Sequence, residues 1–257
     1  MSVILSAYCR NKVRLSISSK QPAKNVLLQD NIQKNDEIKE VQENTLSVQP
    51  SLDDAVNLID NEISDYVTTV DEAKFFCVGI IDIVNSTKTV SKLSQKKSSR
   101  YYELFLNTMA KSLHHFNTQI LKTMGDSLLF YFPETCFAER KFGFLTCLES
   151  GFSLKDSYIE LNRHLEEEGL PKIDFRISFD YGYLTIMKDM ENRIDLVGPT
   201  INTCSKINSL CPINDMIIGG DLYEKTKNFE EYKIKKIDSY SIDLKHSYPV
   251  YSVGRKI

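Results

Sequence analysis

The chain has 257 residues, a hydrophobic content of 42% and a net charge of −3, with a sequence pI of about 5.9. This length accommodates one large domain or a domain with a tail, and the charge gives no indication of nucleic-acid binding. No apolar run approaches the roughly 18 residues that a membrane-spanning helix needs. The six cysteines show no CxxC spacing. We therefore expect a cytoplasmic protein whose cysteines are reduced and mostly buried.

The first part of the chain differs in composition from the rest. Residues 1–50 have a basic start and an acidic, Gln/Asn-rich continuation, which predicts a disordered polar arm. Residues 51–70 contain apolar side chains at helical spacing, namely Leu52, Val56, Ile59, Ile63 and Tyr66. This short amphipathic helix either packs on its own domain or forms a stalk that pairs two subunits.

Residues 71–257 alternate between strand and helix patterns. We expect a strand over 75–82, a helix over 98–115 and two strands in "TQILKTMGDSLLFYF", which turn at Gly125-Asp126. A long helix over 137–168 follows, then a second hairpin in "KIDFRISFDYGYLTIMK" around Asp180–Gly182, a helix near 199–210 and terminal strands. The order β-α-β-β-α-β predicts an α+β protein with a ferredoxin-like core.

Two aspartates are expected to meet in such a core. Asp82 ends the first strand, and Asp126 lies in the turn of the hairpin that neighbours this strand. Two adjacent carboxylates repel each other, and a divalent cation such as Mg²⁺ or Mn²⁺ removes the conflict. After Asp82, "VNST" leads toward a helix whose first N–H groups can hold phosphate oxygens. The pattern suggests a metal–nucleotide site, although a Gly-Asp turn is often only a turn and Asp82 can also cap a helix.

Four segments extend this interpretation: "IIDIVNST", "LKTMGDSLLFYF", "FRISFDYGYLTI" and "IDLVGPTINTCSKINSL". In order and spacing they resemble the catalytic domain of class III adenylate/guanylate cyclases, over about residues 73–254. The resemblance implies a ferredoxin-like fold that works as a homodimer with active sites at the subunit interface. It also implies conversion of a nucleoside triphosphate to a 3′,5′-cyclic nucleotide and pyrophosphate with two divalent metal ions, Mg²⁺ or Mn²⁺.

The resemblance assigns roles to individual residues. Asp82 and Asp126 match the metal-binding aspartates of the family, and Ile83 is also placed at the metal site. Lys122 and Asp195 match the pair that reads the base. An ammonium suits the N1 acceptor of adenine and a carboxylate suits its 6-amino donor, so this pair indicates ATP rather than GTP.

Further matches concern the ribose and the phosphates. Asn202 matches the asparagine that orients the ribose, and Arg176 matches an arginine that contacts the β- and γ-phosphates. Lys245 matches a second triphosphate lysine in a segment that conforms poorly to the family. Lys206 stands where the family has an arginine that stabilises charge on the α-phosphate. Lysine keeps the charge but lacks the planar fork of arginine.

The sequence thus predicts an adenylate cyclase that makes cyclic AMP from ATP in cyclic nucleotide signalling. One alternative, suggested by Lys206, is a weak or degenerate cyclase-fold module that binds nucleotide and regulates. Another is a guanylate cyclase, which Lys122 and Asp195 disfavour. A metal-free scaffold is the least favoured, because it leaves the two aspartates unexplained.

Overall fold

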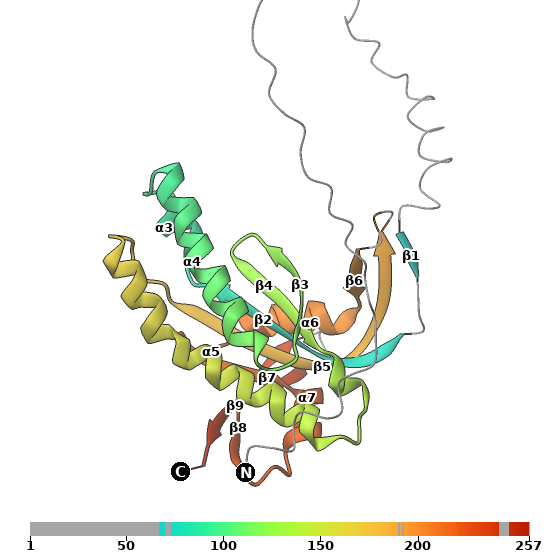
Figure 1. The fold of residues 1–257 in the computed structure, drawn as a ribbon. Coiled ribbons are helices and arrows are strands. Elements are labelled where there is room, and N and C mark those ends of the chain that lie inside the picture. Colours follow the sequence, from blue (N-terminus) through green and yellow to red (C-terminus); the bar gives the residue numbers. More distant parts are fainter. Residues whose placement is uncertain (1–66, 70–72, 190, 192, 242–246, 257) are drawn as a thin grey trace, which may run out of the picture. The chain divides into compact units, whose positions relative to one another are not determined.

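A computed structural model describes residues 67–69, 73–189, 191, 193–241 and 247–256 (Figure 1). The predicted polar arm (1–50), nearly all of the predicted amphipathic helix (51–70) and Lys245 lie outside these residues. Within them, no helix combines the length and the apolar character needed to cross a membrane.

The described strands form one mixed sheet with the order β3-β4-β2-β5-β7-β9-β8. Two short strands, β1 (Val67–Thr69) and β6 (Ile194–Val197), pair with β5. The other strands are β2 (Lys74–Ile83), β3 (Gln119–Met124), β4 (Ser127–Phe132), β5 (Phe175–Asp189), β7 (Met216–Gly219), β8 (Tyr232–Ser241) and β9 (Ser247–Arg255).

The ferredoxin-like core lies in the part of the sheet ordered β3-β4-β2-β5, where neighbouring strands are antiparallel. Helices α3 (Ser86–Val90) and α4 (Gln95–His114) connect β2 to β3. The 3₁₀ helix η1 (Pro133–Cys136) and helix α5 (Lys141–Glu167) connect β4 to β5. The predicted βαββαβ order is therefore confirmed.

Helices cover both faces of this core. Because side chains alternate along a strand, β2 sends Cys77 and Ile81 to the cluster that it shares with α4 and α5, which lie side by side in Figure 1. It sends Val78 and Ile80 to a second cluster, which contains Cys204 of α6 (Pro199–Asn208). Asp82 continues the second set, so it lies on the sheet face that α6 covers.

The second predicted hairpin, around Asp180–Gly182, is wrong. Strand β5 runs without interruption from Phe175 to Asp189, and the chain reverses only between Asp189 and β6. Gly182 serves close packing instead of a turn, because a Cβ atom there would lie 2.5 Å from Thr200 Oγ1 at the start of α6. This close approach lets α6 pack directly on β5.

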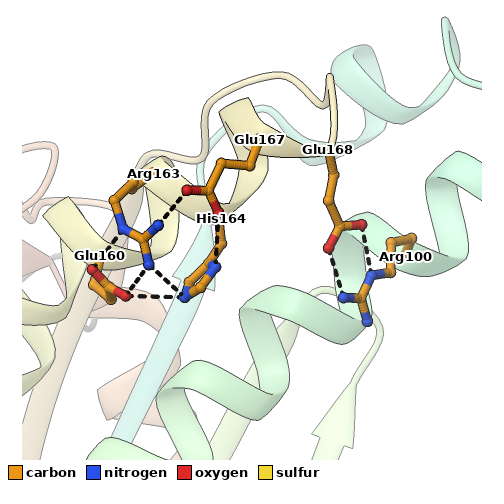
Figure 2. A network of polar contacts seen from close by, with 6 residues as sticks. All are labelled: Arg100, Glu160, Arg163, His164, Glu167 and Glu168. Carbon is orange, nitrogen blue, oxygen red and sulfur yellow. Dashed lines mark hydrogen bonds and ion pairs between the residues drawn. The ribbon is translucent and has the colours of Figure 1, made fainter.

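A bidentate ion pair joins the start of α4 to the end of α5. Arg100 donates from Nε and Nη2 to the two carboxylate oxygens of Glu168, at 2.8 and 2.6 Å (Figure 2). Lys97 Nζ donates to the carbonyl oxygen of Gly169, at 3.2 Å. Single exposed pairs contribute little, whereas bidentate geometry restricts orientation. These contacts hold the start of α4 against the end of α5. The neighbouring ion pairs in Figure 2 lie within α5 and involve Glu160, Arg163, His164 and Glu167.

The cysteines in the described residues are free, and those of the core, Cys77, Cys147, Cys204 and Cys211, are buried. Burial raises the pKa of the Cys77 and Cys204 thiols. The expected burial is confirmed for these four residues, and Cys9 lies outside the described part of the chain.

Strand β5 also buries a carboxylate. Asp180 is 1% exposed and accepts hydrogen bonds from Tyr248 Oη at 2.8 Å and from the backbone N–H of Tyr181 at 2.9 Å. A Cβ atom on Gly219, just before α7 (Gly220–Thr226), would lie 2.4 Å from Asp180 Oδ1. Burial raises the pKa of Asp180 to about 7, and the charge of Asp221 acts in the same direction.

This pKa makes the stability of the domain depend on pH. Between the unfolded pKa of Asp180, about 3.9, and the folded value, the folded state holds a proton that the unfolded state has released. The contribution of Asp180 to the free energy of unfolding therefore falls as pH rises from about 4 to about 7. We expect Asp180→Asn to remove this dependence.

The measurement is urea unfolding of the wild-type and Asp180→Asn proteins across this pH range. As pH rises, the unfolding free energy of the wild-type protein should fall relative to that of the variant. A difference that stays constant from pH 4 to pH 7 would contradict the assignment.

Candidate active site

Asp82 and Asp126 lie close together at one end of β2. In the ladders, Asp82 is opposite Ser127 of β4 and opposite Arg176 of β5. Asp126 directly precedes Ser127, in a turn where Gly125 has a φ of 67°. Glycine adopts this left-handed conformation without strain, so the turn can place Asp126 beside the strand end that carries Asp82.

The surroundings of Asp82 disfavour its ionisation. Burial and the negative charge of Asp126 together raise the pKa of Asp82 to about 6, although the positive charge of Arg176 acts in the opposite direction. The pKa of a carboxyl group rises in this way when it is desolvated next to a like charge. A bound cation would favour the ionised form of Asp82.

A serine fixes one of the two acids. Ser86 is 5% exposed, begins α3 and donates a hydrogen bond from Oγ to Asp126 Oδ2. Its position is set by Asn85, which adopts a left-handed conformation with a φ of 56° and turns the chain from β2 into the helix. Ser86 is not among the predicted site residues, and its one signal in the sequence is its place in "VNST".

Arg176 has an unused donor next to these acids. Its Nε is buried and makes no hydrogen bond within the described residues. A buried donor without a partner costs about 1–3 kcal/mol, so this Nε needs an acceptor, which a ligand can supply. A guanidinium beside two carboxylates can bind an anion that also bears a metal ion.

The donor set fits a hard divalent cation that is shared with a ligand. Within the described residues there is no group of three or more His, Cys, Asp or Glu side chains that could hold a metal by themselves. Mg²⁺ typically uses one or two carboxylates and completes its shell with water and substrate phosphates, which Asp82 and Asp126 suit. Ile83 is 2% exposed and its side chain lies in the core, so it can contribute through its backbone oxygen.

Lys122 and Asp195 form a second polar group. Lys122 Nζ lies 2.6 Å from Asp195 Oδ2, and their side chains are 44% and 42% exposed. Lys122 belongs to β3, and Asp195 belongs to β6 and pairs with Met187 of β5. The pair borders a cavity of about 500 Å³ that is also lined by Leu121, Met187, Lys188, Asp189, Arg193, Ile194 and Val197.

Asn202 and Lys206 lie on the outer side of α6. Both are exposed, whereas Cys204 and Ile207 of the same helix are buried. Residues four apart share one face of a helix, so the amide of Asn202 and the ammonium of Lys206 are presented together. Lys245, the remaining predicted substrate contact, lies outside the described residues.

The site residues therefore form separate groups in one chain. No hydrogen bond or ion pair joins Lys122 or Asp195 to Asp82 or Asp126, all four of which the structure describes. The outer face of α6 points away from the sheet that carries Asp82. The chain presents two separate groups. One is the acidic group, which consists of Asp82 and Asp126 with Arg176 beside them, and the other contains the Lys122–Asp195 pair.

Comparison with known proteins bears on the fold. No family model and no curated protein matches the chain. Among solved structures, the adenylyl cyclase CyaB from P. aeruginosa superposes with a TM-score of 0.63 at 17% identity, over 72% of this chain and 96% of that one. The chain has the class III nucleotide cyclase fold.

Guanylyl cyclases share this cyclase fold. The guanylyl cyclase Cya2 has a TM-score of 0.63 at 16% identity, over 72% of this chain and 94% of its own. The guanylate cyclase domain of RhGC from Catenaria anguillulae, in complex with GTP, has a TM-score of 0.61 at 18% identity, over 73% of this chain and 100% of that domain. The cyclase fold thus spans both base specificities, and identities this low do not distinguish between them.

The electrostatics of the acidic group can be tested without any ligand. Because Asp126 raises the pKa of Asp82 and Arg176 lowers it, we expect Asp126→Asn to bring this pKa below about 6 and Arg176→Ala to raise it. The measurement is a ¹³C NMR titration of the Asp82 carboxyl in metal-free protein. Shifts in the same direction in both variants would contradict the arrangement.

Proposed function

We propose that this protein is an adenylate cyclase that converts ATP to 3′,5′-cyclic AMP and pyrophosphate in cyclic nucleotide signalling. The observation that carries the proposal is the close approach of Asp82 and Asp126 beside Arg176, in a chain with the class III cyclase fold. In the reaction the 3′-oxygen of ATP forms a bond to the α-phosphorus. The bond from this phosphorus to the bridging oxygen breaks, pyrophosphate leaves and the hydroxyl proton is released.

The acidic group would hold the metal ions and the triphosphate. Two divalent ions, Mg²⁺ or Mn²⁺, supply positive charge at the 3′-hydroxyl and the phosphates when bound to Asp82 and Asp126. Ser86 keeps Asp126 oriented, since a hydrogen bond from a neighbouring residue fixes a metal-binding carboxylate. Arg176 contributes its unused Nε donor to the β- and γ-phosphates.

The Lys122–Asp195 pair supports adenine as the base. In the free protein the two side chains pair with each other while partly exposed. Such surface pairs contribute about 0–1 kcal/mol, so exchanging the pair for contacts with a base costs little. Lys122 then donates to N1 of adenine, and Asp195 accepts from its 6-amino group. Guanine presents the reverse pattern at these positions.

A second copy of the chain would complete the site. Asn202, which orients the ribose, and Lys206, which stabilises charge on the α-phosphate, face away from the sheet that carries Asp82. Four apolar side chains on β3 and β6, the strands that carry the Lys122–Asp195 pair, are exposed in the single chain: Ile120, Met124, Ile194 and Val197. Exposed apolar patches of this kind mark interaction surfaces. We therefore propose a homodimer with active sites at the subunit interface.

A nucleotide-binding module with little turnover is the second candidate. Lys206 favours it, because lysine cannot make the bidentate phosphate contact of an arginine. Stabilisation of charge in the transition state is often the largest contribution to catalysis. In this case the protein binds ATP and the metal ion through the same residues, and its nucleotide-bound conformation is the regulatory signal.

The experiment incubates the purified full-length protein with ATP or GTP and with Mg²⁺ or Mn²⁺, and quantifies cyclic products by mass spectrometry. We expect cyclic AMP in excess over cyclic GMP, and a loss of at least about a hundredfold in Asp82→Ala, because both metal ions depend on this carboxylate. Product that persists in Asp82→Ala would refute the assignment of the site. Bound ATP with no cyclic product from either nucleotide would favour the second candidate.

A further inference from the structure

A buried amide connects α6 to the two strands that carry the acidic group. Asn208, the last residue of α6, is 5% exposed. Its Nδ2 donates to the carbonyl oxygens of Ile80 at 3.4 Å and Arg176 at 3.3 Å, and to Ser178 Oγ at 3.1 Å. One side chain thus contacts β2 two residues before Asp82 and β5 at Arg176 itself.

The neighbouring polar contacts strengthen this connection. Ser178 is fully buried and donates from Oγ to the carbonyl oxygen of Cys204, one turn earlier in α6, at 2.9 Å. Because Asp82 and Arg176 are opposite each other in the β2–β5 ladder, the amide of Asn208 lies directly next to the strand pair on which they stand. A shift of α6 along the sheet would break these bonds.

The position of α6 matters because its outer face carries Asn202 and Lys206. The inner side of the same helix is fixed at its end by Asn208, two residues after Lys206. We propose that Asn208 is a positioning residue that fixes α6 on the β2–β5 strands of its own chain, and so sets how each copy presents Asn202 and Lys206 to the acidic group of the other copy. This inference rests on the proposed cyclase function.

The chain offers a matched control. Asn162 of α5 is 7% exposed, and its Nδ2 also donates to backbone carbonyls, those of Tyr158 at 3.1 Å and Ile173 at 3.0 Å. Its Oδ1 accepts from the N–H of Ile173 at 2.8 Å. Asn162 therefore joins α5 to the segment before β5 by similar hydrogen bonds, none of which involves α6 or β2.

The experiment compares Asn208→Leu with Asn162→Leu in the full-length protein. Both variants remove a buried amide of similar size, so both should lower the melting temperature. We expect only Asn208→Leu to lower kcat, on the order of tenfold to a hundredfold, because small displacements of catalytic groups are this costly. The KM for ATP should change by less than about twofold, since base and triphosphate contacts remain.

Where a leucine variant does not fold, Asn208→Ser and Asn162→Ser form the substitute pair, which removes the amide without adding apolar bulk. Equal loss of kcat in the Asn208 and Asn162 variants, or unchanged kcat in the Asn208 variant, would overturn this inference while the cyclase function stands. A folded wild-type protein that makes no cyclic nucleotide would remove the proposed function and this inference together.

Discussion

The close approach of Asp82 and Asp126 is the constraint on which the rest of the site depends. Burial at the strand end and the nearby charge of Asp126 both raise the pKa of Asp82, so this close approach opposes the ionisation of Asp82. The fold nevertheless maintains it through the β2–β4 pairing, the left-handed Gly125 and the hydrogen bond from Ser86. Structure that holds like charges together without an evident gain in stability indicates a functional site.

The same sheet explains why one chain carries two separated groups of site residues. Strands β2 and β5 present Asp82 and Arg176 at one end, while β3 and β6 bring Lys122 to Asp195. Helix α6 covers the sheet between them and directs its polar face outward. Under the proposed function, a nucleotide that needs both groups would be bound by two copies of the chain, and each copy would have to hold α6 in a fixed position. The buried amide of Asn208 meets this need.

Much of this architecture was predictable, since periodicity and turn residues are local signals. The strand ending at Asp82, the Gly125 turn and the helices on either side of it were found from such patterns. Asp180–Gly182 was misread as a turn because a glycine that serves close packing looks the same in sequence. The sequence does not predict the role of Asn208, and it predicts that of Ser86 only weakly, through its place in "VNST". Their hydrogen-bond partners are distant along the chain, and serine and asparagine carry no distinctive pattern.

The most direct test of the account is complementation between two inactive variants. Asp82→Ala damages the acidic group and Asn202→Ala damages the outer face of α6, so each homodimer loses both sites. In a mixed dimer one site receives both intact parts, and random mixing should restore about a quarter of the wild-type activity. Recovery of that order, together with mixed dimers detected by native mass spectrometry, is the result predicted here. Mixed dimers that remain inactive would contradict a site built from two copies of the chain.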